Sequence, residues 1–506
     1  MCGCRLADIT KVLKRIHPME IPTPPKEDTD PQLRYAAQRL EFWNDYARSI
    51  ESSAKWGSFY RRRLQEVYRT IVPPRLRVLE LGCGQGDLLA ALKPSAGVGV
   101  DFSPEMISKA LRKYGSRPGL RFLLEDAHNF KSVEKFDVII LSDLINDLWD
   151  VQRVLERVKE HCQPRTRVVL NFYSRLWQLP LRMASLLGFT KVRPPLNWLT
   201  VEDETNLLYL CDFEVIRNWT EILWPLNTPV VASLSNRWLV KIPPFRYLAL
   251  ANLLVARPKP SAISPRELPL VSVIVPARNE AGNIPQIMKR VPEMGKGTEI
   301  IFIEGHSKDQ TYEAIQNVIA ENPNRMCKLF RQTGVGKGDA VRLGFSRASG
   351  DILMILDADL TVPPEDLPRF FEAIYTHKGE FVNGVRLVYP MEDRAMRFPN
   401  FIANKFFSLA FTWLLGQSIK DTLCGTKVIS KHDYDLIAEN RSHFGEFDPF
   451  GDYDLIFGAA RLNMKMVDMP VRYRERTYGT TNIQRWRHGL LLFRMLLVAA
   501  GKIKFT

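Results

Sequence analysis

Two carboxylates separated by one residue end a short apolar segment in the second half of the chain. The segment, Ile352 to Leu356, is followed by Asp357, Ala358 and Asp359. An apolar run of this length between polar residues is typical of a buried strand in an α/β sheet. Residues two apart in extended chain point to the same side, and open α/β sheets bind ligands at the carboxyl ends of their strands. The pair therefore predicts a site for Mg²⁺ or Mn²⁺ carrying a diphosphate.

A second candidate site lies in the segment Arg77 to Leu92, which reads RVLELGCGQGDLLAAL. Its apolar start predicts a buried strand, its glycines predict a tight turn, and its apolar end predicts the start of a helix. Such a turn lets the backbone approach a ligand, and the helix N-terminus offers free N–H groups. The next predicted strand, 97–100, ends in Asp101, a carboxylate placed to accept hydrogen bonds from two ribose hydroxyls.

Two more predicted strands, 120–124 and 136–141, also end in carboxylates, at Asp126 and Asp143. This order of motifs resembles the class I S-adenosylmethionine-dependent methyltransferases over roughly residues 35–257. The resemblance implies a Rossmann-like domain in which the glycine loop, Asp101 and Asp126 contact the methionine end, the ribose and the adenine of S-adenosylmethionine. The implied cofactor residues are Glu80, Gly82, Gly84, Gly86, Asp101, Asp126 and Ala127. The methyl acceptor stays open, because direct transfer requires alignment more than it requires an acid or base.

Four segments of the second half, PARNE, IIFIEGHSKD, GKGDA and DADL, follow one another in this order. Their order and spacing resemble the family 2 glycosyltransferases of the GT-A fold, and within them the dolichyl-phosphate or polyprenyl-phosphate sugar synthases. The resemblance implies a nucleotide-sugar donor and a lipid-phosphate or glycan acceptor. Glu304 stands where the family usually has Asp, which leaves the choice of nucleotide open. The residues that match the donor site are Pro276, Arg278, Glu280, Glu304, Lys337, Asp339 and Asp357, and those that match the metal motif are Asp357 and Asp359.

Residues nearer the C-terminus resemble the acceptor side and the catalytic acidic motif of the same family. They are Lys427, Asp452, Asp454, Arg474 and Arg476. A lipid phosphate is already anionic and needs no general base, so Lys427, Arg474 and Arg476 would bind it as cations. A sugar hydroxyl would need a carboxylate to take its proton, with Asp452 as the first candidate and Asp454 as the second.

Length and composition limit the remaining interpretations. A chain of 506 residues is too long for one core, and the proline-containing stretch 258–269 marks a linker between predicted domains 1–257 and 270–506. The formal charge of +14 suits nucleic acid, an anionic membrane or phosphorylated substrates. No Arg-rich low-complexity tail or nucleic-acid motif supports the first of these. Seven scattered cysteines argue for a reducing compartment rather than a disulfide framework.

Two apolar stretches, 401–416 and 489–501, are too short to span a bilayer but long enough for helices in a membrane interface or a core. Between residues 472 and 506, eight Lys and Arg residues stand against one acidic residue. Basic charge beside apolar helices favours an anionic membrane surface. The N-terminus has no apolar core typical of a secretory signal. We therefore expect a cytoplasmic protein attached peripherally to the inner face of a membrane.

Three other interpretations compete for the second half. A sugar-nucleotide-binding domain without turnover is supported by the departure at Glu304 alone. A nucleotidyltransferase would require a Gly-rich, Arg-containing loop after the first strand, and PARNE is not one. An ATPase is disfavoured because 334–337 lacks the glycine spacing of a Walker loop and the Ser or Thr that follows its lysine.

Overall fold

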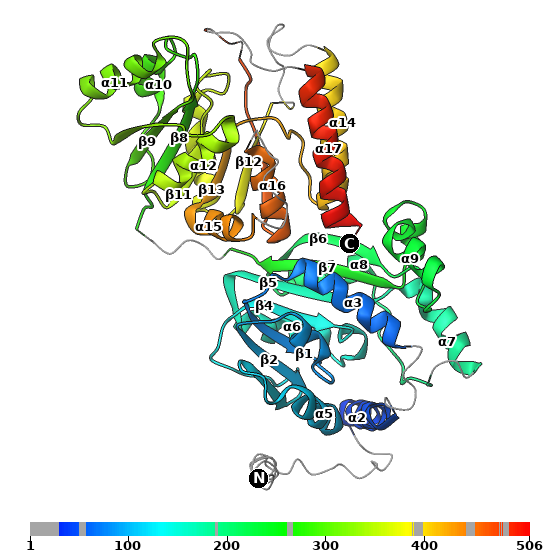
Figure 1. Cartoon of the computed structure of the whole chain (residues 1–506). Coiled ribbons are helices and arrows are strands. Elements are labelled where there is room, and N and C mark those ends of the chain that lie inside the picture. The colour runs from blue at the N-terminus through cyan, green and yellow to red at the C-terminus, as the bar shows by residue number, and fades with distance from the viewer. Residues whose placement is uncertain are drawn as a thin grey trace, which may run out of the picture.

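The computed structural model describes residues 30–49, 57–187, 191–260, 267–386, 388, 398–441, 451–474, 476, 478 and 485–505. In this part of the chain, two seven-stranded sheets are each covered by helices, one in an N-terminal half and one in a C-terminal half (Figure 1). The predicted α/β class with two folded regions is thereby confirmed. The predicted domain borders at 257 and 270 stay a prediction.

The first sheet has the strand order β3-β2-β1-β4-β5-β7-β6, and β7 runs antiparallel to β5 and β6. The order reverses between β1 and β4, and ligands of open α/β sheets bind at such a reversal. The strands are β1 Arg77–Leu81, β2 Ala96–Asp101, β3 Leu120–Leu124, β4 Phe136–Ser142, β5 Cys162–Tyr173, β6 Phe213–Glu221 and β7 Ala251–Pro258.

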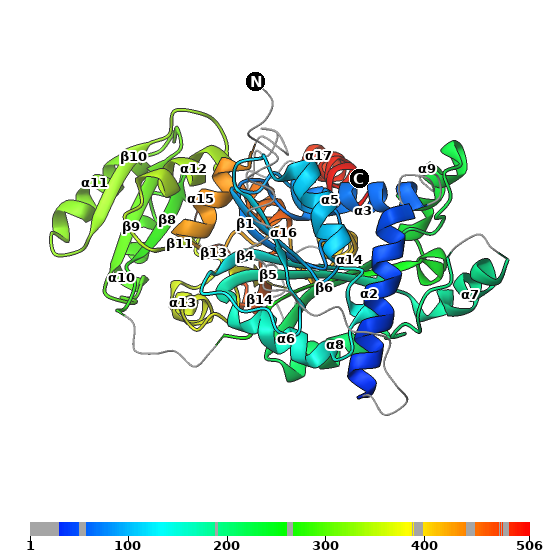
Figure 2. The same cartoon turned by 90° about the horizontal axis from the view of Figure 1, so that it is seen from below.

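Helices cover both faces of this sheet, with α3 and α5 on one side and α6 and α8 on the other (Figure 2). Their apolar residues form separate clusters on the two faces, so the strands between them are almost continuously buried. The helices are α2 Pro31–Ser49, α3 Gly57–Ile71, α4 Asp87–Ala91, α5 Pro104–Tyr114, η1 Ile145–Asp147, α6 Val151–Glu160, η2 Arg175–Trp177, α7 Gln178–Leu186, α8 Val201–Leu210, α9 Pro229–Arg237, η3 Leu239–Lys241 and η4 Phe245–Leu248.

The second sheet has the order β10-β9-β8-β11-β13-β12-β14, and β13 is antiparallel to both of its neighbours. Its order reverses between β8 and β11, the strand that ends just before Asp357. The strands are β8 Val271–Ala277, β9 Thr298–Glu304, β10 Cys327–Arg331, β11 Ile352–Ile355, β12 Phe381–Val385, β13 Lys427–Ser430 and β14 Met466–Pro470.

The helices of the C-terminal half divide between the two faces of the second sheet. One apolar cluster takes residues from α10, α11 and α13, and the other takes residues from α12 and α14 to α17. The helices are α10 Ile284–Arg290, α11 Thr311–Glu321, α12 Lys337–Arg347, η5 Pro364–Asp366, α13 Leu367–Tyr375, α14 Phe398–Leu415, α15 Lys431–Glu439, α16 Asp452–Arg461, α17 Arg485–Ala499 and η7 Ala500–Lys504.

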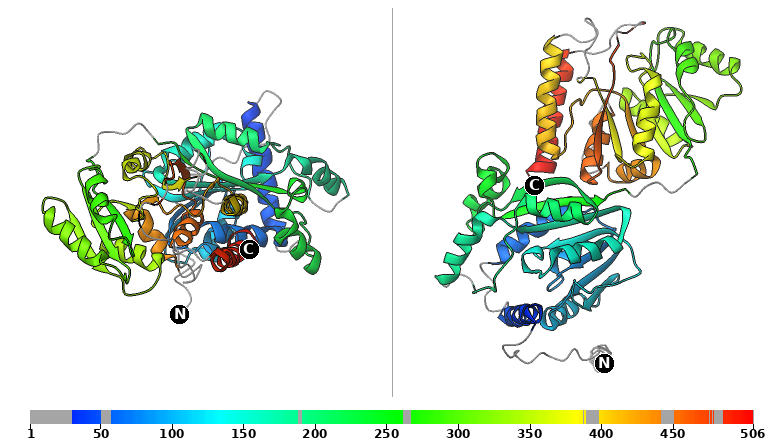
Figure 3. Two further views of the ribbon diagram at one scale, coloured as in Figure 1. Left: turned by 90° about the horizontal axis from the view of Figure 1, so that it is seen from above. Right: turned by 180° about the vertical axis from the view of Figure 1, so that it is seen from behind.

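The two apolar stretches singled out in the sequence form α14 and α17, which stand side by side (Figure 3). Each helix buries one face in the core, and each also exposes large apolar side chains. The exposed ones are Phe406, Leu409, Leu490, Phe493 and Leu497. No helix among the described residues is both long and apolar enough to cross a bilayer.

A buried carboxylate from the C-terminal half joins the two halves. Glu380, which precedes β12, contacts Arg167 on β5 at 2.7 Å and Arg257 on β7 at 3.4 Å. All three residues are buried. Burial raises the pKa of Glu380, but the two guanidinium groups outweigh this and hold its pKa below the usual value. Arg167 also donates from Nε to the carbonyl oxygen of Asn463, 2.8 Å away, so the two halves share polar contacts inside their interface.

We predict that Glu380→Gln destabilises the protein by about 3–5 kcal/mol, because it leaves two buried guanidinium groups without their carboxylate. Urea unfolding of the full chain measures this change. Glu372→Gln is the control, because Glu372 pairs with Lys378 while about two thirds of each side chain is exposed, and loss of such a pair costs about 1 kcal/mol or less. Equal effects of the two substitutions would contradict the assigned role of Glu380.

Candidate functional sites

The glycine loop after β1 requires glycine at three positions. Gly82, Gly84 and Gly86 have φ values of 72°, 51° and 75°, in the left-handed region that costs other residues strain. The N–H of Gly82 donates to the carbonyl oxygen of Val100 at 2.8 Å, which ties the loop to β2. A Cβ on Gly86 would lie 2.5 Å from the Phe122 ring, so the loop also packs too closely for a side chain there.

Asp101, at the end of β2, is bonded to this loop. Its Oδ2 accepts from the N–H of Gly84 at 2.8 Å, and its Oδ1 accepts from the N–H of Ser103 at 2.9 Å. Burial raises the pKa of Asp101 to about 6, although the two N–H donors lower it. The structure therefore brings the predicted ribose carboxylate and the glycine loop together.

Glu80 and Asp126, the other two predicted cofactor carboxylates, make different contacts. Glu80 is 2% exposed and accepts from the N–H of Leu89 at 3.0 Å, so it holds the start of α4. Burial raises its pKa well above the usual range. Asp126 follows β3, and its Oδ1 lies 2.7 Å from Nδ1 of His128. Ala127 beside it is buried in the core.

A cavity of about 1070 Å³ opens beside the loop. Glu80, Gly82 and Gly84 line one part of it, and its walls are mainly apolar. Ligand pockets usually have volumes of about 300–1,000 Å³, so there is room for a cofactor and a second molecule. The aromatic residues that line it are Trp43, Tyr46, Tyr60, Tyr173, Trp177, Trp198 and Trp224.

Asp143, immediately after β4, also lines this cavity. It has a φ of 56° and accepts hydrogen bonds from the Tyr60 hydroxyl at 2.7 Å and from Asn171. Burial raises the pKa of Asp143 to about 6, while these donors oppose the shift. A carboxylate with this pKa is suited to accept a proton near neutral pH.

In the C-terminal half, Asp357 follows β11 and pairs with Lys337 at the start of α12, with Oδ1 and Nζ 2.5 Å apart. Burial raises the pKa of Asp357, but Lys337, Lys427 and Arg386 together hold it below its usual value. A Cβ on Gly425 would overlap both Asp357 Oδ2 and Lys337 Nζ. The loop before β13 therefore approaches this ion pair so closely that a side chain at residue 425 would have to displace it.

Asp359 faces a second cation. Its Oδ2 lies 2.7 Å from Nη2 of Arg476, whose Nη1 lies 2.8 Å from Oε1 of Glu280. The other oxygen of Asp359 accepts from the Thr361 hydroxyl at 2.8 Å. The structure thus brings together the predicted metal residue Asp359, the donor residue Glu280 and the predicted acceptor cation Arg476.

The remaining donor residues shape the loops at the same edge of the sheet. Glu304 accepts from the N–H of Ser307 at 2.6 Å, and Asp339 accepts from the N–H of Gly334 at 3.0 Å. Pro276 is the penultimate residue of β8, and the side chain of Arg278 beyond it is exposed.

The predicted acceptor residues differ in their burial and in their partners. Lys427 is buried and donates to the carbonyl oxygen of Cys424, and it is one of the cations that lower the pKa of Asp357. The side chain of Arg474 is exposed, and its backbone N–H donates to the carbonyl oxygen of Thr361 at 3.0 Å. Asp454 pairs with Arg441 at 2.7 Å. Asp452 begins α16, but its side chain lies outside the described part of the structure.

Among the described residues, no group of three or more His, Cys, Asp or Glu side chains is arranged to hold a metal ion. Asp357 and Asp359 offer two carboxylates, and each faces a cationic group in this structure. Proteins bind Mg²⁺ through one or two carboxylates while substrate phosphates and water complete its shell. The donor set therefore fits a metal that arrives with a diphosphate.

Comparison with known families distinguishes the two halves. Residues 74–204 match the family model described as a methyltransferase domain, and residues 272–434 match the model of glycosyl transferase family 2. The chain therefore carries a methyltransferase domain and a glycosyl transferase family 2 domain. Both resemblances predicted from the motifs are thereby confirmed.

Similar proteins match one half at a time. The undecaprenyl-phosphate 4-deoxy-4-formamido-L-arabinose transferase of Pectobacterium carotovorum is 27% identical over 215 residues, which are 42% of this chain and 62% of that protein. The dolichol-phosphate mannosyltransferase of Pyrococcus furiosus is 36% identical over 106 residues, 21% of this chain and 30% of that protein. The chain thus spans less than two thirds of the length of these relatives.

Solved structures similar to the chain include two methyltransferases. The N-methyltransferase NodS of Bradyrhizobium japonicum, in complex with S-adenosyl-L-homocysteine, is 14% identical, with 40% of this chain and 87% of that chain covered and a TM-score of 0.29. An S-adenosylmethionine-dependent methyltransferase of Mesorhizobium loti is 19% identical, with 37% and 92% covered and a TM-score of 0.29.

Several residues around the two sites belong to no motif in the sequence. In the methyltransferase half, Tyr60 and Asn171 are far from Asp143 in the chain and meet it only after folding. In the glycosyltransferase half, Arg386 holds Asp421 through both carboxylate oxygens, at 2.7 and 2.9 Å. Arg386 lies 35 residues before Asp421 in the chain, and no sequence motif connects the two residues.

We predict that Asp101→Ala weakens binding of S-adenosylmethionine at least tenfold, because each charge-assisted hydrogen bond to the ribose is worth roughly 1.5–3 kcal/mol. Calorimetry of the full chain measures the affinity. The affinity of the unmodified protein should also decrease as the pH falls below about 6, because protonation removes the charge of Asp101. Glu156→Ala is the control, because it alters an exposed side chain on α6. Unchanged affinity of Asp101→Ala at neutral pH would contradict the assignment.

Proposed function

We propose that the chain is a bifunctional enzyme. The C-terminal half, residues 270–506, transfers a sugar from a nucleotide-sugar to a lipid-phosphate acceptor. The N-terminal half, residues 1–257, transfers a methyl group from S-adenosylmethionine, and residues 258–269 link the two. The observation that carries the first activity is the meeting of Asp357 and Asp359 with Lys337 and Arg476 at the point where the strand order of the second sheet reverses.

The donor site is built for a nucleoside diphosphate. Asp357 and Asp359 would hold Mg²⁺ or Mn²⁺, which when bound supplies positive charge to the departing diphosphate. Lys337, at the first residue of α12, is placed to contact the same phosphates together with the free N–H groups of that helix. Glu280, Glu304 and Asp339 shape the loops on which Pro276 and Arg278 would meet the nucleoside.

A polyprenyl phosphate is the acceptor that we favour. The relatives that match this half are named for transfer to undecaprenyl phosphate and dolichol phosphate. An anionic phosphate needs no general base and would be bound by the cations Arg474 and Arg476, with Lys427 behind them. If the acceptor is instead a sugar hydroxyl, Asp452 is the preferred base, because Asp454 is already paired with Arg441.

Access to a lipid acceptor would follow from peripheral attachment to a membrane. The exposed apolar residues of α14 and α17 would enter the bilayer interface. The basic residues of the sequence between 472 and 506 would add attraction to an anionic surface, about 1 kcal/mol for each cation near it. The protein should sediment with anionic vesicles at low salt and be released only in part at high salt. Leu409→Ser combined with Leu490→Ser should weaken this attachment. Equal sedimentation of the unmodified protein and the double variant would contradict attachment through α14 and α17.

The methyl acceptor is proposed to be a molecule with a large apolar part and one ionisable nucleophile. The aromatic lining of the cavity would contact the apolar part. Asp143, oriented by Tyr60 and Asn171, would accept the proton that the nucleophile loses. A carboxylate with a pKa near 6 is mostly ionised at neutral pH and is therefore ready to act as a base.

We predict that Asp359→Ala abolishes sugar transfer and leaves methyl transfer unchanged, because the two sites belong to different sheets. The full chain is incubated with a panel of nucleotide-sugars, Mn²⁺ and polyprenyl phosphate in lipid vesicles, and the product is identified by mass spectrometry. Asp435→Ala, which removes an exposed carboxylate on α15, is the matched control and should transfer normally. Full transfer by Asp359→Ala, or by the unmodified protein in excess EDTA, would show that the metal assignment is wrong. Binding of nucleotide-sugar without any product would favour a binding domain.

A further inference from the structure

One surface of the methyltransferase half carries many exposed apolar side chains. It is formed by η2 and α7, by α9, and by the turn that contains η4, which lie together at one edge of that half (Figure 1, Figure 3). We call this surface, built from residues 174–187, 191–193 and 222–250, the apolar edge. It is separate from the exposed residues of α14 and α17, which belong to the other half.

The helix α7 contributes one part of the apolar edge. None of its nine residues is buried. Leu179, Met183 and Leu186 are 71%, 54% and 72% exposed. A surface helix of a globular protein normally turns its apolar residues toward the core. In α7 these residues point away from the core of the described chain, so the helix presents an apolar face to its surroundings.

The other part comes from α9 and the turn that follows it. Val230 and Leu234 of α9 are exposed. Every residue from Ile242 to Leu248 is exposed as well, in a stretch that reads IPPFRYL. Single exposed apolar side chains are ordinary, but a large group of them marks a surface for a membrane or a partner.

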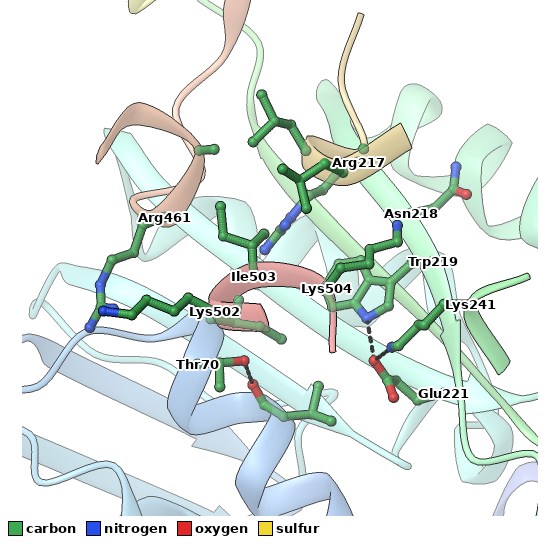
Figure 4. A pocket seen from close by; sticks show the side chains of 16 residues that line it. Thr70, Arg217, Asn218, Trp219, Glu221, Lys241, Arg461, Lys502, Ile503 and Lys504 are labelled. Atoms are coloured by element: carbon green, nitrogen blue, oxygen red, sulfur yellow. Dashed lines mark hydrogen bonds and ion pairs between the residues drawn. The ribbon is translucent and has the colours of Figure 1, made fainter. Parts of the chain in front are cut away.

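The elements of the apolar edge are bonded to one another and to the first sheet. The indole N–H of Trp177, in η2, donates to the carbonyl oxygen of Leu248 at 2.9 Å, which joins the start of α7 to η4. Lys241, in η3 between α9 and η4, pairs with Glu221 of β6, whose Oε1 also accepts from the indole N–H of Trp219 at 3.1 Å (Figure 4). The exposed side chains are therefore presented by a fixed surface.

The charge of the apolar edge has one sign. Segments 174–193 and 222–250 contain seven Lys and Arg residues and no Asp or Glu. All of the basic residues except the buried Lys241 are exposed: Arg175, Arg182, Lys191, Arg193, Arg237 and Arg246. Apolar and basic side chains without acidic ones are suited to the interface of an anionic bilayer. A second copy of the chain would instead place like charges against each other, which is unfavourable.

The cavity beside the glycine loop opens at the apolar edge. Leu186, Val192 and Trp224 line that cavity and are also exposed. A side chain with both properties lies at the opening of a cavity rather than at its end. Arg182 and Lys191 have both properties too, so the opening carries positive charge.

We propose that the apolar edge docks on an anionic lipid bilayer and that the methyl acceptor is a lipid of this bilayer, which enters the cavity through the opening beside α7. The docking does not depend on either activity, whereas the choice of acceptor rests on the methyl transfer proposed above. In that transfer, a hydroxyl oxygen of the lipid head bonds to the methyl carbon, the bond from this carbon to the sulfonium sulfur breaks and leaves its electron pair on sulfur, and Asp143 takes the hydroxyl proton.

Hydrogen–deuterium exchange of the full chain locates the contact. Exchange is measured with vesicles of phosphatidylcholine alone and of phosphatidylcholine mixed with phosphatidylglycerol. We expect amides of α7, α9 and residues 242–248 to exchange at least threefold more slowly with the anionic vesicles, and amides of α11 to be unaffected. Slower exchange in α14 and α17 alone would support the attachment proposed for those helices and overturn docking of the apolar edge.

Substitutions test which side chains carry the docking. Met183→Ser, Leu234→Ser and Phe245→Ser together should weaken binding to the anionic vesicles at least fivefold in sedimentation. All three side chains are exposed and none lines the cavity, so the affinity for S-adenosylmethionine should stay unchanged in calorimetry. The matched control combines Val133→Ser, Leu210→Ser and Met326→Ser, which are exposed apolar residues elsewhere, and should change binding less than twofold.

Equal binding by the triple variant and the control overturns the docking. A dimer that the triple substitution dissociates, in a protein that ignores the vesicles, would show that the apolar edge is an interface between copies and would overturn it too.

The acceptor is tested with S-adenosylmethionine that carries a tritiated methyl group and with vesicles made from a membrane lipid extract. Label should enter the lipid fraction, and the triple variant should transfer it at least fivefold more slowly. A protein that binds S-adenosylmethionine but labels only water-soluble molecules overturns the lipid acceptor. A protein that does not bind S-adenosylmethionine contradicts the proposed methyl transfer itself, and with it the acceptor, while the exchange and sedimentation results still decide the docking.

Discussion

The ion pair between Arg386 and Asp421 organises the loop on which the glycosyltransferase site depends. Asp421 is fully buried, and Arg386 meets both of its oxygens. Burial raises the pKa of Asp421, but Arg386 and several N–H donors lower it to about 2. Asp421 also accepts from the N–H groups of Leu423 and Cys424, so one carboxylate sets the path of the chain that brings Gly425 against Asp357. A carboxylate buried without such partners would cost several kcal/mol, which is why the loop is held in one conformation.

The same carboxylate connects the sheet to the apolar helices. Asn404 of α14 donates to Asp421 at 3.1 Å, and Asn383 of β12 donates to its carbonyl oxygen at 2.8 Å. The helix that exposes Phe406 and Leu409 is therefore fixed to the loop that borders the predicted donor site. In the proposed function, this connection would hold a membrane-facing helix and the sugar-transfer site in a constant relation.

Compensation of buried charge also explains how the two halves meet. Glu380 pairs with two arginines of the first sheet, and Asp433 pairs with Arg165 at 3.0 Å. The interface therefore contains ion pairs whose partners come from both halves of the chain.

Local patterns along the chain were enough to predict the two α/β halves, the strands that lead to Asp101 and Asp357, and the two family resemblances. Strand periodicity, glycine spacing and short motifs are local, so they can be read along the chain. The partner of each carboxylate depends on how the folded chain packs: Arg476 reaches Asp359 across 117 residues, and the Tyr60 hydroxyl reaches Asp143 across 83. Packing also gives α14 and α17 one face in the core and one exposed face each. Their composition alone was compatible with either a core or a membrane interface. Long-range pairs depend on how the sheets and helices pack, and a single sequence carries no local pattern that specifies them.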